Sequence, residues 1–173
     1  MRPVRASHWL WLPVAAVSTP VCATNYLSVE HAQQAIFPGA RFESLPLPLS
    51  DEQREAIAKS SGSPVSRHEA QSWRVGDAGY FFVDEVVGKH ELITFAVGLN
   101  ADGTIRQVEI LAYREPYGYE IRNERWRRQF VGKRAPLRMD HDIQNISGAT
   151  LSCTHLTQAI NRILALYDVV LRH

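Results

Sequence analysis

The longest regular pattern in the sequence is an amphipathic run close to the C-terminus. Its apolar residues recur at spacings of three and four, the period of one helix face; they are Leu156, Ala159, Ile160, Ile163, Leu164, Tyr167, Val170 and Leu171. Polar residues fill the remaining positions, namely Thr157, Gln158, Asn161, Arg162, Asp168 and Arg172. The pattern predicts a long helix with an apolar face turned to a core and a polar face opposite.

The stretch Ser147-Gly148-Ala149-Thr150-Leu151 precedes this run directly. The first backbone N–H groups of a helix lack intrahelical partners and carry positive partial charge, so such an end favours a phosphate. Gly148 permits close approach of a ligand to the backbone, and Thr150 supplies a hydroxyl. Because Ser and Thr are also favoured helix caps, the stretch predicts either a cap or an anion site that contains a hydroxyl.

The composition is that of a globular protein. The chain has 173 residues, of which 45% are apolar and 21% are charged, which suits one domain with a sizeable core. The formal net charge is +1, so overall charge indicates neither a nucleic-acid partner nor an anionic membrane surface. We therefore expect no nucleic acid among the partners.

The N-terminal segment 1–23 has the pattern of a secretory signal peptide. Arg2 and Arg5 form a basic start, residues 8–17 form a short apolar core, and residues 21–23 offer small side chains for cleavage. The apolar core is too short to span a bilayer, and no later segment reaches that length. We expect this segment to be removed on export and the mature protein to be periplasmic; the alternative is a buried N-terminal helix.

Removal of the signal peptide leaves Cys153 as the one cysteine of the mature chain. An intrachain disulfide is then excluded, even in an oxidising compartment. A lone Cys in the first turn of an amphipathic helix is usually packed in the core. The alternative is a thiol activated by the helix N-terminus.

The remaining chain changes from helical to β patterns near residue 70. Serines are placed to cap short helices over 28–37 and 50–59, and the proline-containing segment 41–49 is at best an edge strand or an extended linker. Alternating and β-branched residues then predict strands, and Asp102-Gly103 is a hairpin turn signal. The expected strands cover 72–75, 79–87, 91–99 and 104–113.

Consecutive strands with helices before and after them predict an α+β fold. We expect an antiparallel sheet flanked by helices, with the long C-terminal amphipathic helix following the Ser-Gly-Ala-Thr stretch. The chain divides into the signal peptide (1–23), an N-terminal helical and extended segment (24–70) that packs on the domain, and the main domain (71–173).

Three segments resemble one known family in the same order along the chain. Ser147-Gly148-Ala149-Thr150 before a terminal helix resembles the flavinylation motif of the FMN-binding domain family. That family includes the C subunit of the sodium-pumping NADH:quinone oxidoreductase and the G subunit of the Rnf complex. The strand that runs into Arg114-Glu115-Pro116-Tyr117-Gly118-Tyr119 and the stretch Trp126–Lys133 resemble two further regions of the family.

The resemblance implies FMN as the cofactor, attached to Thr150 through a phosphoester bond. It implies that the loop of Glu115 and Gly118 lies over the flavin, and it adds Lys133 to the site. At the position six before the flavinylated threonine, where the family usually has Asp, this chain has Gln144. Tyrosines suit an isoalloxazine ring because they give flat apolar cover with hydrogen-bond donors, so two more residues join the predicted site, Tyr113 and Tyr117.

A run of basic residues extends over residues 122–138 and overlaps the Trp126–Lys133 stretch. Acidic residues are interleaved with it, so the run fits a solvated helix face. The alternative is a patch that clamps the FMN phosphate with one or two arginines. The run consists of Arg122, Arg125, Arg127, Arg128, Lys133, Arg134 and Arg138.

Three functions fit these observations. The first is a periplasmic flavoprotein that carries electrons through FMN bound covalently to Thr150, with a periplasmic flavin transferase and membrane or periplasmic redox proteins as partners. The second is a module that binds FMN or another phosphorylated ligand reversibly. The third is a flavin-free interaction domain. No metal-ligand spacing and no nucleophile-elbow or dinucleotide-binding motif appears in the sequence.

Overall fold

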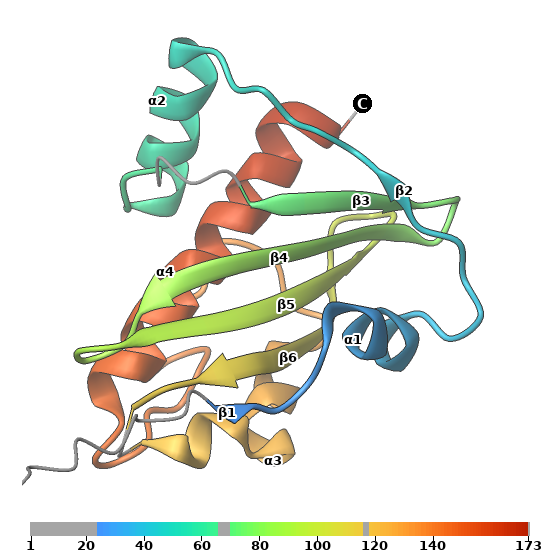
Figure 1. Ribbon diagram of the computed structural model, residues 1–173. Helices are drawn as coiled ribbons and strands as arrows, with labels where there is room; N and C mark the ends of the chain where they lie inside the picture. Colours follow the sequence, from blue (N-terminus) through green and yellow to red (C-terminus); the bar gives the residue numbers. More distant parts are fainter. Residues whose placement is uncertain (1–23, 66–69, 116–117, 173) are drawn as a thin grey trace, which may run out of the picture.

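The architecture is a six-stranded antiparallel sheet with helices on both faces (Figure 1). The computed structural model describes residues 24–65, 70–115 and 118–172. The strand order is β1-β6-β5-β4-β3-β2, and every neighbouring pair is antiparallel. This confirms the α+β class expected from the sequence, including the antiparallel sheet and the long helix after the Ser-Gly-Ala-Thr stretch.

Four strands form the body of the sheet and two short ones form its edges. The body is β3 (Gln71–Val75), β4 (Gly79–Val87), β5 (Leu92–Asn100) and β6 (Ile105–Tyr113), and the edges are β1 (Thr24–Asn25) and β2 (Glu43–Ser44). The four body strands match the alternating segments of the sequence to within a residue or so. As expected, the proline-containing segment contributes only a short edge strand.

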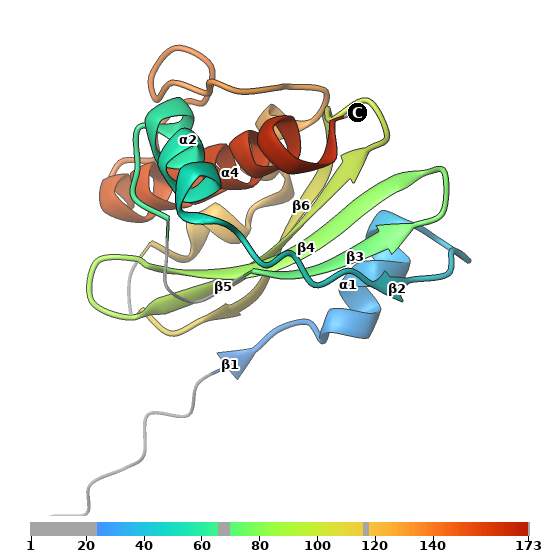
Figure 2. The same ribbon diagram turned by 90° about the horizontal axis from the view of Figure 1, so that it is seen from above.

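The helices lie in two layers, with α2 and α4 on one face of the sheet and α1 on the other (Figure 2). The helices are α1 (Val29–Ile36), α2 (Asp51–Ser61), α3 (Glu124–Arg127) and α4 (Thr150–Leu166), with 3-10 turns η1 (Tyr119–Arg122) and η2 (Arg128–Phe130) and a π-helical turn η3 (Tyr167–Leu171). In the part of the chain that the structure describes, no helix is long and apolar enough to cross a membrane.

The first two helices begin at the serines that the sequence indicated. Ser28 Oγ accepts the N–H of His31 at 3.2 Å. At α2, Ser50 and Gln53 form a reciprocal capping box, which satisfies two of the N–H groups left unpaired at a helix start. These caps hold the N-terminal segment in two short helices, α1 against β5 and β6 and α2 against α4.

The β5–β6 hairpin turns at Asp102 and Gly103, as predicted. Asp102 Oδ1 accepts from both the backbone N–H and the hydroxyl of Thr104, at 2.9 and 2.7 Å. Gly103 has a φ of +83°, and a Cβ there would lie 2.2 Å from the Tyr167 ring. The Tyr167 hydroxyl also donates to the Ala101 carbonyl at 2.6 Å, so the C-terminal end of the long helix packs onto this turn.

Helix α4 buries its predicted apolar face against the sheet. Leu156, Ala159 and Ile160 are fully buried, and they pack with Phe82, Phe95 and other strand residues in the larger of two core clusters. Cys153 is also fully buried, and burial raises the pKa of its thiol. The thiol is therefore packed and not activated, which decides between the two readings of this residue.

The polar face of α4 differs from the expectation, because part of it is covered. Thr157 and Asn161 are 2% and 6% exposed. Asn161 accepts the N–H of Leu137 at 2.8 Å and donates to its carbonyl at 2.9 Å, while the Thr157 hydroxyl contacts Met139 Sδ at 3.2 Å. The segment between η2 and α4 crosses this side of the helix, and helical periodicity carries no information about such a covering segment.

Replacing Asn161 with Ala should destabilise the fold measurably. The substitution leaves the N–H and the carbonyl of Leu137 buried without their partners, so we expect a loss of about 2–3 kcal/mol in the free energy of unfolding. Urea denaturation measures it. The matched control is Gln158→Ala, an exposed position on the same helix, where about 0.5 kcal/mol or less is expected. Equal effects at both positions would contradict this role of Asn161.

Candidate functional site

The Ser-Gly-Ala-Thr stretch forms the N-terminus of α4, and no side chain caps it. Ala149 is the N-cap residue, Thr150 is the first helical residue, and the cap has no side-chain hydrogen bond. Gly148 is exposed and has a φ of +87°, a conformation that glycine adopts without strain. The reading of this stretch as a side-chain cap is therefore not what the structure shows. The helix end keeps its positive partial charge uncompensated by a side chain.

The hydroxyl of Thr150 is exposed and oriented by a neighbour. Asn145 Nδ2 donates to Thr150 Oγ1 at 3.1 Å. Asn145 Oδ1 in turn accepts the N–H of Ile146 at 2.8 Å, which sets the direction of the amide. The sequence alone did not predict Asn145 as a site residue, although it lies only five residues before Thr150.

An open cavity of about 600 Å³ lies beside Thr150. Its size falls within the range of about 300–1,000 Å³ that small-molecule and cofactor sites occupy. Three parts of the chain line it: the β4–β5 turn, the segment after β6 and the start of α4. The lining residues are Lys89, His90, Glu115, Gly118, Glu120, Gly148, Ala149, Thr150, Leu151 and Ser152.

The cavity thus gathers most of the residues predicted for the site. Glu115, Gly118, Gly148, Ala149, Thr150 and Leu151 all line it. Ser147 is exposed immediately before Gly148 and is not among the lining residues. Tyr117 lies outside the described residues.

Tyr113 lies behind two residues that line the cavity, Gly118 and Ser152. Its side chain is 2% exposed and belongs to the larger core cluster, and its hydroxyl lies 3.5 Å from Ser152 Oγ. Burial raises the pKa of this phenol. A Cβ on Gly118 would lie 2.7 Å from the Tyr113 hydroxyl and 3.2 Å from Ala149 Cβ. Tyr113 therefore supports the loop and the helix start from below, where we had expected it to cover a ring.

Lys133 lies away from the cavity. Its carbonyl accepts the N–H of Ile105, the first residue of β6, whereas the cavity is beyond Tyr113 at the other end of that strand. At about 3.4 Å per residue the two ends of β6 are roughly 27 Å apart. The structure does not bring Lys133 to the other predicted site residues.

The basic run is engaged in ion pairs of its own. Arg127 pairs with Glu109 at 2.7 Å, and Arg128 pairs with Glu124 at 2.6 Å on an exposed helix face. None of the cavity-lining residues is an arginine. These two arginines are thus ion-paired within the protein, with Arg128 solvated and Arg127 largely buried, and they do not form a phosphate clamp at this cavity.

The Trp126–Lys133 stretch supports the loop that leads into the site. Trp126 is buried, its ring packs edge-on against Phe130, and its Nε1 donates to the carbonyl of Gln144 at 2.7 Å. Gln129 Oε1 accepts the N–H of Gln144 at 2.8 Å. The contribution of this stretch is therefore to fix the backbone just before the Ser-Gly-Ala-Thr residues.

Glu115 anchors the β4–β5 turn at the cavity wall. The backbone N–H groups of Lys89, His90 and Glu91 all donate to Glu115 Oε1 within 3.0 Å. The side chain is 9% exposed; burial by itself raises the pKa of the carboxyl, but the three amide donors outweigh burial, and the pKa lies below its ordinary value. Glu115 is therefore ionised at neutral pH and holds the turn.

Lys89 and His90 were not predicted for the site. The signal that could have found them is topological: antiparallel pairing places Tyr113, at the end of β6, opposite Ile93, near the start of β5. The β4–β5 turn must then lie beside the segment that follows β6. Local sequence patterns do not reveal this neighbourhood, because it depends on the register of two strands.

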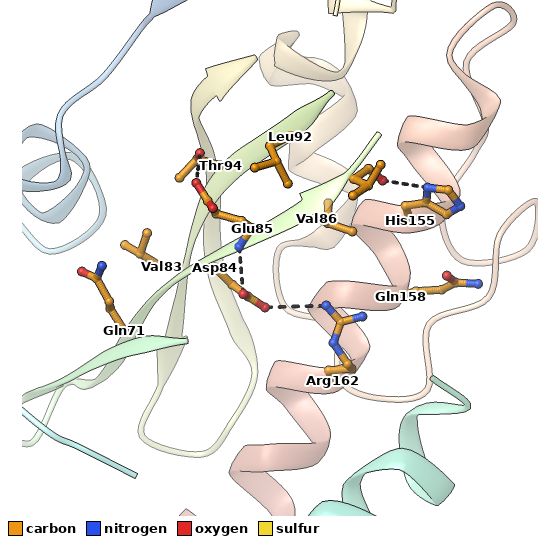
Figure 3. Close-up of a pocket in the computed structure, with 11 residues that line it drawn as sticks. Gln71, Val83, Asp84, Glu85, Val86, Leu92, Thr94, His155, Gln158 and Arg162 are labelled. Carbon is orange, nitrogen blue, oxygen red and sulfur yellow. Dashed lines mark hydrogen bonds and ion pairs between the residues drawn. The ribbon is translucent and has the colours of Figure 1, made fainter. Parts of the chain in front are cut away.

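A second hollow of about 600 Å³ lies between the end of β4 and the middle of α4 (Figure 3). Its charged groups already engage one another. Arg162 pairs with Asp84 at 3.7 Å, and Thr94 donates to Glu85 at 2.7 Å. Burial raises the pKa of Asp84, opposed by the Glu85 N–H and by Arg162. Its polar groups therefore serve the packing of α4 on β4.

These features define an α+β domain with an uncapped helix start that suits an anion, and with Thr150 and Lys89 lining the same cavity. Residues 88–165 match the FMN-binding domain family. All of the cavity-lining residues fall within the matched segment. A search among curated proteins finds no match to the chain.

FMN is the cofactor that this family assignment indicates, and the residues of the cavity fit it. The uncapped N–H groups of α4 and the ammonium of Lys89 suit its phosphate. Leu151 and the glycine-lined walls leave apolar, open space for a flat ring. Among the described residues no cluster of His, Cys, Asp and Glu could hold a metal ion.

The Glu115 carboxylate should make stability depend on pH. Because its pKa is lower in the folded state, its stabilisation is present above the ordinary value of about 4.5 and is lost as the pH falls from there through the folded-state pKa. Glu115→Gln should therefore lower the free energy of unfolding by about 1–2 kcal/mol at pH 7, and the difference should shrink towards pH 3.

Urea denaturation of both proteins from pH 7 to pH 3 measures this difference. Glu55→Gln, which changes an exposed carboxylate on α2, is the control and should leave the stability nearly unchanged at every pH. If the difference in unfolding free energy between the native protein and the Glu115→Gln variant stayed constant down to pH 3, the carboxylate would not be ionised and bound by the amides as described.

Proposed function

We propose that this protein carries electrons through an FMN attached covalently to Thr150 by a phosphoester bond. The observation that carries the proposal is the exposed Thr150 hydroxyl at the uncapped start of α4, inside a cavity formed by the FMN-binding domain segment. A phosphodiester at Thr150 keeps one negative charge, which the helix N-terminus stabilises.

Attachment requires an activated donor, because a phosphate monoester and a hydroxyl do not condense unaided in water. An anhydride of FMN such as FAD supplies the activation. Thr150 Oγ1 forms the new O–P bond, the anhydride O–P bond breaks, AMP leaves, and the hydroxyl proton passes to solvent. Asn145 holds Oγ1 at the cavity for this exchange, and a flavin transferase is the catalyst that we expect.

Bound flavin supplies the redox chemistry, and the protein supplies binding, orientation and electrostatics. The covalent bond retains the cofactor while the cavity stays open on one side, so a redox partner can approach. We expect that partner to be a membrane or periplasmic redox protein. Export by the segment 1–23 would place the protein in the compartment of the transferase.

The second candidate is a module that binds FMN reversibly, without the phosphoester. Gln144, in place of the Asp that the family usually has six residues before the threonine, favours it, because a transferase that reads that carboxylate would find an amide. Denaturation and gel filtration of the purified protein separate the two candidates. Flavin that stays with the unfolded chain supports the covalent carrier, and flavin lost on unfolding supports the reversible module.

Thr150→Ala should abolish covalent flavin labelling and leave the fold intact. Thr150 is not the cap residue of α4, so we expect the free energy of unfolding to change by about 1 kcal/mol or less. Thr150→Ser should retain part of the label because the nucleophilic oxygen survives. In-gel flavin fluorescence of protein co-expressed with a flavin transferase measures the label.

Thr154→Ala provides the matched control, since it removes a hydroxyl one turn further along the same helix. It should keep full labelling. Mass spectrometry that finds an unmodified peptide containing Thr150, in protein made with the transferase, would overturn the covalent proposal and support the reversible one.

The mature protein should begin after residue 23. The basic start, short apolar core and small residues of the segment 1–23 motivate this expectation. N-terminal sequencing of protein from the periplasmic fraction of a Gram-negative host measures it. Periplasmic protein that retains Met1, or protein found solely in the cytoplasm, would contradict export by this segment.

A further inference from the structure

Hydrogen bonds hold the β4–β5 turn at the flavin cavity through its backbone N–H groups and also through its backbone carbonyl groups. On the amide side, three successive N–H groups, from Lys89 to Glu91, converge on one carboxylate oxygen of Glu115. Successive amides that point at one anion form a nest. Here the protein fills the nest with its own buried carboxylate, so these three amides are not available to a phosphate.

On the carbonyl side, α4 holds the same turn through His155, which lies in the second turn of the helix. His155 Nδ1 is 2.8 Å from the Val87 carbonyl oxygen and 2.9 Å from that of Gly88. Both partners are acceptors, so Nδ1 carries the proton. The helix that presents Thr150 thus also grips the turn that faces it.

Gly88 makes this arrangement possible by lacking a side chain. A Cβ there would lie 2.8 Å from Glu115 Oε1 and 3.0 Å from Ile93 Cδ1. The glycine is required by the close approach of the carboxylate, since its φ is not in the left-handed region. The turn therefore has little room to shift while Glu115 and His155 are both bound.

We infer that His155 and Glu115 are positioning residues that hold Lys89 at the cavity, where its ammonium pairs with the FMN phosphate. Lys89 lines the cavity with Thr150, and backbone amides already supply hydrogen bonds to the Glu115 carboxylate, so the lysine is not needed as its partner. The inference rests on the proposed function, because it concerns how the same cavity holds FMN.

The test compares FMN with riboflavin, which has the same ring and no phosphate. The unmodified full chain, produced without a flavin transferase, is titrated with each flavin, and fluorescence gives the dissociation constants. Lys89→Gln should weaken FMN about tenfold and leave riboflavin nearly unchanged. His155→Leu should show the same FMN-selective loss, because the turn is released.

Two further variants separate positioning from general structural support. His155→Asn keeps an N–H donor close to the Nδ1 position and should restore the affinity for FMN. In a Lys89→Gln background, His155→Leu should have no additional effect, because His155 acts through the lysine. Initial rates of covalent labelling, measured on the same variants with the transferase present, give a second readout that does not require tight binding of free FMN.

Specific results would overturn the inference. His155→Leu that weakens FMN and riboflavin equally, or that has its full effect without Lys89, would make His155 a structural residue alone. Lys89→Gln with unchanged FMN affinity and labelling rate would exclude the phosphate contact, while labelling at Thr150 would leave the proposed function standing. A chain that neither binds FMN nor becomes labelled would overturn both.

Discussion

The site depends on the burial of α4 against the sheet. Leu156, Ile160 and Ile163 are at most 2% exposed, and each such side chain contributes about 1.5–3 kcal/mol when buried. This packing fixes the direction of the helix and therefore the place of its first residue. Gly148, Thr150 and Leu151 contribute little to the packing, since they are exposed at the end of an element that the core already holds. Thr150 can thus be exposed to solvent while its position stays fixed.

The charges around the cavity are divided between structure and ligand. A buried carboxylate is unfavourable unless its hydrogen bonds are satisfied, and Glu115 obtains them from backbone amides. If a lysine side chain had paired with this carboxylate instead, its charge would not be available to bind an anionic ligand. Tyr113 and Trp126 are used similarly: both are buried in the core, and each also contacts a segment that shapes the cavity, through Ser152 and Gln144 respectively.

Local patterns in the sequence predicted most of the fold, because each element carries its own signal. The serine caps, the Asp102-Gly103 turn and the alternation in β4 to β6 depend on interactions within a few residues. What failed depended on contacts that are distant in the sequence. The burial of Asn161 depends on a segment that crosses the helix. The position of Lys133 depends on the direction of β6, and the burial of Tyr113 depends on how α4 packs over the sheet. Lys89 and His90 were missed for the same reason, since a turn becomes part of a site through the register of two strands.

The loop before the Ser-Gly-Ala-Thr residues holds Gln144 by its main chain. Trp126 binds its carbonyl, Gln129 binds its N–H, and its side chain is exposed. The loop would keep its shape with almost any residue at this position. The stability of the fold therefore places little constraint on the side chain at this position. Under the proposed function, the side chain at position 144 can therefore change without disturbing the backbone that leads to Thr150.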